Sequence, residues 1–80
     1  MNQPKVEIIV ASDVNERDGI GIEVYKAGKL SVEIFRDDTD LTRKITIYEK
    51  EIDLDFLEMC IKSFRKNIPW DYIDYSKLEE

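Results

Sequence analysis

The side chains that could carry out catalysis are scarce in this sequence. Its 80 residues include no histidine and a single cysteine, Cys60. Histidine is the usual general base near neutral pH and the commonest metal ligand, so acid–base catalysis and transition-metal binding both lose their main residue. Cys60 lies in an apolar helical stripe with no imidazole to activate it, and is predicted to be a core residue. The composition therefore predicts a protein that is not an enzyme and uses no metal or cofactor.

Two groups of carboxylates could still act. The run 37–40, Asp-Asp-Thr-Asp, offers clustered oxygen ligands for Ca²⁺ but lacks the glycine and distal glutamate of an EF-hand loop. It is predicted to be a solvated turn, with a weak cation site as the alternative. Glu23 and Glu33 are expected to lie diagonally on one sheet face, about 7–8 Å apart. Paired carboxylates can do acid–base work at such separations, but an open face offers no cleft to raise one pKa.

An aromatic surface is the feature that most needs an explanation. Strand alternation turns Tyr25, Phe35 and Tyr48 away from the predicted helix, with Lys44 among them. Contiguous exposed apolar patches commonly mark an interface, so these four residues are predicted to bind a partner. Three alternatives stay open: a hetero-partner or nucleic acid, a homodimer built face to face or edge to edge, and cross-strand packing of the rings under the N-terminal strand or the tail.

The C-terminal segment, residues 69–80, mixes aromatic and acidic side chains. Trp70, Tyr72 and Tyr75 are predicted to dock on a partner, because Trp and Tyr are enriched among the residues that dominate binding energy. The alternative is that the segment folds back and closes one end of the core.

The elements that position these residues follow from hydrophobic periodicity. A β-branched run and three period-2 patterns predict strands at about 6–10, 20–25, 30–35 and 43–49. A three-residue loop, Lys26-Ala27-Gly28, is predicted between the second and third strands, because it sets Val24 against Leu30 and keeps one face apolar.

The pattern then changes to a period of 3.6, which predicts a helix over about 53–68. Asp53 is its expected N-cap and Pro69 ends it. The fold class is α+β: one domain over residues 1–80, a four-stranded antiparallel meander followed by one C-terminal helix packed on one sheet face (ββββα). The expected buried layer consists of strand residues Ile20, Ile22, Val24, Leu30, Val32, Ile34, Ile45 and Ile47 and helix residues Leu57, Cys60, Ile61 and Phe64.

The charge balance suggests the kind of partner. Twelve basic and 18 acidic residues give a net charge of −6, which repels nucleic acid and favours a basic protein partner. No apolar run approaches the roughly 20 residues of a membrane span, residues 1–15 lack a signal-peptide pattern, and a lone cysteine suits a reducing compartment. We therefore expect a small acidic cytoplasmic protein-binding module without membrane contact. Bacterial immunity proteins, antitoxins and regulatory proteins share this composition, and a homodimer is the other expected assembly.

A second candidate function comes from the order of elements. Over residues 20–68 it resembles the dimeric single-strand-binding domains of transcriptional coactivators, which hold unpaired nucleic acid with basic and aromatic strand residues. The resemblance implies a homodimer and a binding role for the basic residues beside Tyr25 and Phe35, which are Lys26, Lys29, Arg36, Arg43 and Lys44. The net acidity and the position of Glu23 and Glu33 on the same face count against it.

Overall fold

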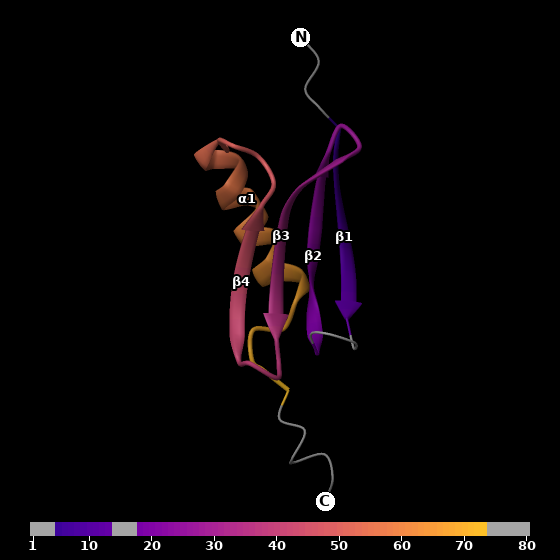
Figure 1. Cartoon of the computed structure of the whole chain (residues 1–80), viewed down its shortest axis with the longest axis vertical. Helices are drawn as coiled ribbons and strands as arrows, with labels where there is room; N and C mark the ends of the chain where they lie inside the picture. Colours follow the sequence, from indigo (N-terminus) through magenta and orange to yellow (C-terminus); the bar gives the residue numbers. More distant parts are fainter. Residues whose placement is uncertain (1–4, 14–17, 74–80) are drawn as a thin grey trace, which may run out of the picture.

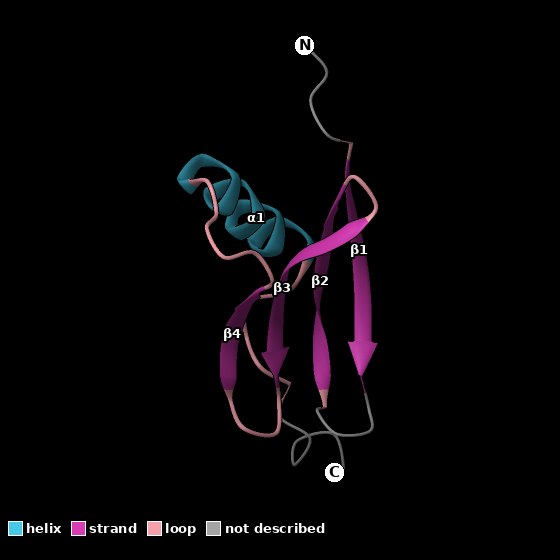
Figure 2. Ribbon diagram, turned by 45° about the horizontal axis from the view of Figure 1, so that its top comes forward, coloured by secondary structure: helices cyan, strands magenta, loops and turns pink. Residues whose placement is uncertain are grey.

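The computed structural model describes residues 5–13 and 18–73, which form one antiparallel sheet and one helix. The strands are β1 (Val6–Asp13), β2 (Gly19–Lys26), β3 (Lys29–Asp37) and β4 (Thr42–Ile47), paired in that order, and the helix is α1 (Leu54–Asn67). The helix lies against one face of the sheet (Figures 1 and 2). The predicted ββββα fold is confirmed.

The β2–β3 hairpin differs from the sequence prediction in its loop. Lys26 pairs with Lys29 around a two-residue turn, Ala27 and Gly28, whose φ angles are +52° and +82°. Positive φ at both central residues is the backbone of a type I′ turn, which matches the twist of the strands. The predicted three-residue loop is therefore wrong.

A β-bulge restores the face alternation that a two-residue loop would have broken. The register shifts between Val24 and Tyr25, so that Val24 pairs with Val32 while Ser31 has no Cα partner. Relative to the predicted pairing the strands have slid by two residues, which keeps Val32 and Ile34 on the same face as Val24. The expectation that Leu30 belongs to the buried layer is wrong, because the bulge sets Leu30 opposite Tyr25, on the face turned away from α1. The observed hairpin also places Glu23 directly opposite Glu33, rather than diagonally as expected.

The helix begins and ends where the sequence predicts. The Asp53 side chain accepts a hydrogen bond from the Phe56 backbone N–H, and the Ile68 backbone N–H bonds to the Phe64 carbonyl. The following Pro69 cannot continue the helix. This confirms the predicted N-cap and the predicted end of α1.

The core lies between α1 and the two central strands. Its buried members are Ile22, Val24, Val32, Ile34, Cys60, Phe64 and Ile68. The expectation that Ile45 and Ile47 belong to this layer is wrong, since their side chains are 43% and 41% exposed. One helix is about 10 Å wide and strands are about 4.8 Å apart, so α1 covers β2 and β3 and leaves both edge strands open.

Within residues 5–13 and 18–73, no helix has the length and apolar character needed to cross a lipid bilayer.

Candidate functional site

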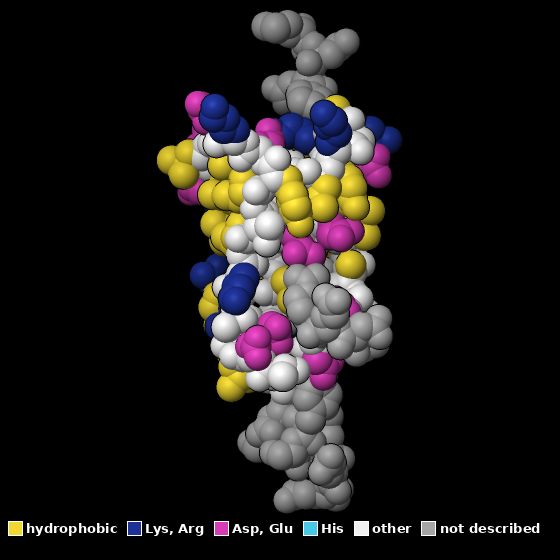
Figure 3. Space-filling view, viewed as in Figure 1, with side chains coloured by type: hydrophobic (Ala, Val, Ile, Leu, Met, Phe, Trp, Pro, Cys, Tyr) yellow, Lys and Arg dark blue, Asp and Glu magenta, His cyan; other side chains and the backbone are white. Residues whose placement is uncertain are grey.

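The predicted aromatic surface lies on the sheet face opposite α1, here called the outer face (Figure 3). Tyr48 is 55% exposed there and Lys44 is exposed, while Tyr25 is half-buried. In Figure 3 apolar side chains form a band across the upper half of this face, and acidic side chains lie below it. Tyr25, Tyr48 and Lys44 are thus accessible, as the sequence predicts.

Phe35 also lies on the outer face, but the expectation that it displays its ring is wrong. It is only 5% exposed. It pairs with Gly21, and its ring lies so close to Gly19 that a Cβ atom added there would come within 3.1 Å of it. Glycines beneath an aromatic ring allow such close approach of ring and backbone, so Phe35 is a packing residue of the outer face.

Two facing carboxylates make the middle of the outer face acidic. Glu23 and Glu33 occupy directly opposed positions, and the Tyr25 hydroxyl donates to Glu23 Oε1 at 3.2 Å. This hydrogen bond to the carboxylate is the main cause that raises the pKa of Tyr25 above its ordinary value of 10.0. Anionic ligands, nucleic acid included, are repelled by such a surface.

A polar cluster around Glu49 lies beside the turn end of the β2–β3 hairpin. The Ser31 hydroxyl donates to Glu49, and Lys26 Nζ lies 3.0 Å from Glu49 Oε2. These contacts lower the pKa of Glu49, with the Ser31 hydrogen bond as the largest cause. Lys26 Nζ also lies 4.3 Å from the centre of the Phe56 ring. Lys26 and Glu49 therefore both have structural partners within the chain.

The described part of the tail, residues 69–73, folds back onto the sheet. Arg43 donates to the Trp70 carbonyl through Nε and Nη2, at 3.1 and 2.7 Å. Its guanidinium lies 3.8 Å from the centre of the Trp70 ring and 4.2 Å from that of Tyr72. Arg65 stacks on Trp70 at 4.3 Å. Trp70 and Tyr72 thus pack back against Arg43 of β4, in line with the alternative that the segment folds back. Tyr75 lies outside the described residues.

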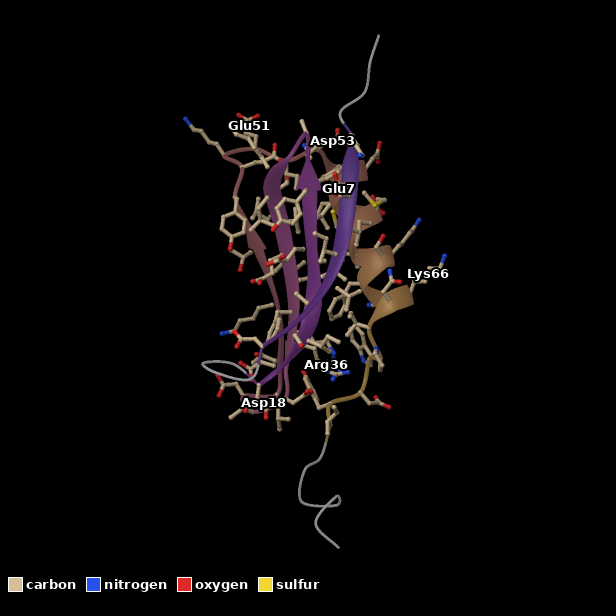
Figure 4. The ribbon with its side chains drawn as sticks, turned by 90° about the vertical axis from the view of Figure 1, so that its right-hand side faces the viewer. Glu7, Asp18, Arg36, Glu51, Asp53 and Lys66 are labelled. Carbon is tan, nitrogen blue, oxygen red and sulfur yellow. The ribbon has the colours of Figure 1, made fainter. Side chains whose placement is uncertain are left out.

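A buried ion pair between Arg36 and Asp38 anchors the same segment. Figure 4 labels Arg36, which lies toward the end of the sheet. Arg36 and Asp38 side chains are 2% and 1% exposed, with Arg36 Nε 2.9 Å from Asp38 Oδ1. Arg36 Nη1 donates to the Pro69 carbonyl at 2.6 Å, and the Ile73 backbone N–H donates to Asp38 Oδ1 at 3.1 Å. Arg36 and Asp38 together therefore bind both ends of the Pro69–Ile73 segment.

This ion pair corrects the expectation for residues 37–40. The run does form a turn, capped by Asp37 Oδ1, which accepts from the backbone N–H groups of Thr39 and Asp40 at 3.0 Å each. Asp37 and Asp38 are nevertheless buried rather than solvated. In the part of the chain that is described, no three His, Cys, Asp or Glu side chains gather in a way that could hold a metal ion.

Sequence analysis missed one apolar feature of the surface, the edge strand β1. Val6, Ile8 and Val10 lie on its helix side and Ile9 on its outer side, and all four are between 38% and 50% exposed. We call this strand and its unpaired side the β1 edge. The first strand of a meander lies at the edge of the sheet. The missed signal was that the sequence of this strand places apolar side chains on both of its faces.

Backbone geometry shows which groups of β1 point outward. The Ala27 N–H donates to the Lys5 carbonyl at 2.8 Å, and the β1–β2 register runs without a shift to Asp13. Hydrogen-bonded pairs alternate in an antiparallel ladder, so odd-numbered residues of β1 bond to β2. The N–H and C=O groups of Val6, Ile8, Val10 and Ser12 point away from the sheet. Figure 4 looks at the molecule from the β1 side, and no described strand pairs with these groups.

The remaining reactive side chain, Cys60, is enclosed. It lies on the core-facing side of α1, where it is fully buried, and burial raises the pKa of its thiol. A buried, protonated thiol is a poor nucleophile.

Comparison of the chain with protein-family models, with curated proteins and with solved structures finds no match in any of the three.

Proposed function

We propose that this chain is a non-enzymatic protein-binding module whose contact surface is the β1 edge. The observation that carries the proposal is an eight-residue edge strand with outward-facing backbone groups and exposed apolar side chains on both faces. Extended segments of a partner add to such edges as an extra strand, with main-chain hydrogen bonds giving affinity and side chains giving specificity.

The opposite edge strand, β4, supports binding less well. Arg43 and Lys44 lie within it, and charged side chains are a common device against pairing at an edge. Arg43 is also engaged by Trp70. The central residues of β1, Ile8 to Ala11, carry no charge. The contrast favours β1 as the edge that accepts a partner strand.

The finer features of this function follow from composition and charge. A net charge of −6 would steer a basic protein toward the chain, as in immunity proteins or antitoxins, and it is compatible with a cytoplasmic setting in a bacterium. The tail contributes less than the sequence suggested, because Trp70 and Tyr72 already contact Arg43. Tyr25, Tyr48 and Lys44 would extend the contact surface over the outer face.

The single-strand-binding alternative has less support than the order of elements suggested. Of its proposed cationic residues, Arg36 is buried against Asp38, Arg43 is engaged by Trp70, and Lys26 is paired with Glu49. Phosphate binding needs several accessible cations. Lys29 and Lys44 are the exposed members of that set.

Site-specific photo-crosslinking in cells tests the proposal. A photoreactive phenylalanine derivative at Val10 should give a defined adduct with one protein, whereas the same group at Glu58, on the exposed side of α1, should give none. The purified adduct partner should bind the chain and its Glu58→Lys variant, and should lose binding to Val10→Lys. Equal adducts at both positions, or binding unaffected by Val10→Lys, would refute a role of the β1 edge.

A further inference from the structure

We infer that the β1 edge binds a second copy of this chain, with the two β1 strands antiparallel and Ile9 facing Ile9 of the second copy. The inference rests on the proposed use of the β1 edge in protein binding, and at this edge it replaces the basic protein suggested by the net charge with a second copy of the chain. It follows from the hydrogen-bonding pattern, the charges and the apolar side chains of residues 5–13.

Hydrogen bonding restricts the registers. The outward-facing backbone groups belong to Val6, Ile8, Val10 and Ser12, so even-numbered residues must pair with even-numbered residues of the second copy. With Ile9 on the two-fold axis, Val6 pairs with Ser12 and Ile8 with Val10 of the second copy. Each copy then donates four backbone hydrogen bonds and accepts four. In this register every outward-facing group of the strand has a partner.

Charge selects the same register. With Ile9 on the axis, Lys5 lies opposite Asp13 of the second copy, and symmetry repeats this pair at the other end. Moving the axis to Val10 would set Glu7 against Asp13 of the second copy, which is repulsive. Moving it to Ile8 would set Lys5 against Ala11 and Glu7 against Ile9. The strand is therefore self-complementary in charge in only one of these three registers.

Apolar contacts agree with it as well. On the helix side, Ile8 meets Val10 of the second copy twice, and on the outer side the two Ile9 side chains meet across the axis. These side chains are 38% to 50% exposed in the single chain. A two-fold axis perpendicular to the sheet keeps both helices on one side. The product is a continuous eight-stranded sheet, in which the two β1 strands are central and no longer edges.

Disulfide trapping of the purified full chain tests the register. Directly opposed residues that do not exchange hydrogen bonds have Cα atoms about 4.5 Å apart, which is within the range of a disulfide. Ile9→Cys is therefore expected to form a covalent dimer under mild oxidation. Glu7→Cys, which faces Ala11 of the second copy, should not form one by itself, but the double variant Glu7→Cys/Ala11→Cys should. The unmodified chain is a control for Cys60, which is buried.

Light scattering separates this inference from the proposed function. The expected result is a mass that doubles with concentration and returns to that of one chain in Val10→Lys, while circular dichroism stays unchanged. Equal trapping of Ile9→Cys and Glu7→Cys, or a monomer at every concentration, overturns the inference. If the chain is a monomer and its photoreactive Val10 variant captures a different protein that also binds the purified chain, the inferred self-association is refuted. The proposed function would then still stand. A monomer without such a partner would refute the proposed function too.

Discussion

Replacing Asp38 by Ala should remove a large part of the stability of this domain. Asp38 is 1% exposed, it neutralises the 2% exposed Arg36, and it accepts the Ile73 backbone N–H. Removing one partner of a buried ion pair leaves an uncompensated charge and typically costs about 3–5 kcal/mol. A domain of 80 residues has roughly 4–12 kcal/mol of stability in total. The expected loss is thus about half of that stability at the middle of both ranges.

Urea unfolding followed by Trp70 fluorescence measures this loss, because Trp70 lies in the segment that the ion pair anchors. Asp40→Ala is the matched control: Asp40 is an exposed carboxylate two residues away, and its substitution should change stability by less than about 0.5 kcal/mol. The double variant Arg36→Met/Asp38→Leu should be more stable than Asp38→Ala, since it leaves no buried charge. A loss below about 1 kcal/mol for Asp38→Ala would refute the assigned role of the pair.

Two further predictions concern the sheet. Gly21→Ala would press a Cβ atom onto the Ile34 carbonyl oxygen of the neighbouring strand, so we expect thermal melting to show destabilisation by about 1–3 kcal/mol. An unchanged melting temperature would contradict the close approach. Glu49→Gln should destabilise the chain at pH 7 but not at pH well below 4.5. The contacts with Ser31 and Lys26 lower the pKa of Glu49 in the folded state. Their stabilisation is therefore present above the unfolded-state pKa of Glu49 and is lost as the pH falls through its folded-state pKa. A pH-independent difference between the two proteins would exclude that linkage.

The hairpin shows how far periodicity alone can go. Compared with a plain two-residue loop, a three-residue loop and a bulge each shift the pairing by one residue, in opposite directions. Both therefore set Val24 opposite an apolar residue of β3. The sequence therefore predicted the buried face of β2 and β3 but not their pairing. The Ala27-Gly28 turn and the bulge at Ser31 moved the pairing by two residues and brought Glu23 opposite Glu33.

The helix was predictable because its signals are local. An N-cap at Asp53, a 3.6-residue apolar stripe and a terminating proline act within a few residues of the sites they determine. How much of the sheet that helix covers is not a local property. It depends on the width of one helix relative to the width of four strands. Because the helix is narrower, this comparison would have predicted that Ile45 and the β1 side chains are exposed.

The candidate site was the least predictable part. Arg36, Asp38 and Arg43 were assigned by sequence to solvent or nucleic acid, yet they bind the segment at residues 69–73, which is about 30 residues away along the chain. Such contacts depend on tertiary structure, which composition and spacing do not contain. The β1 edge could have been found, because a meander always leaves its first strand with one unpaired side.

The most direct test of the account is amide hydrogen exchange in β1 as a function of protein concentration. In the isolated chain the odd-numbered amides, such as that of Ile9, should be protected by β2, while those of Val6, Ile8, Val10 and Ser12 should exchange rapidly. We expect these four amides to become protected when the chain associates, and we expect Val10→Lys to abolish this protection. Association that leaves the four amides in rapid exchange would contradict binding through the β1 edge.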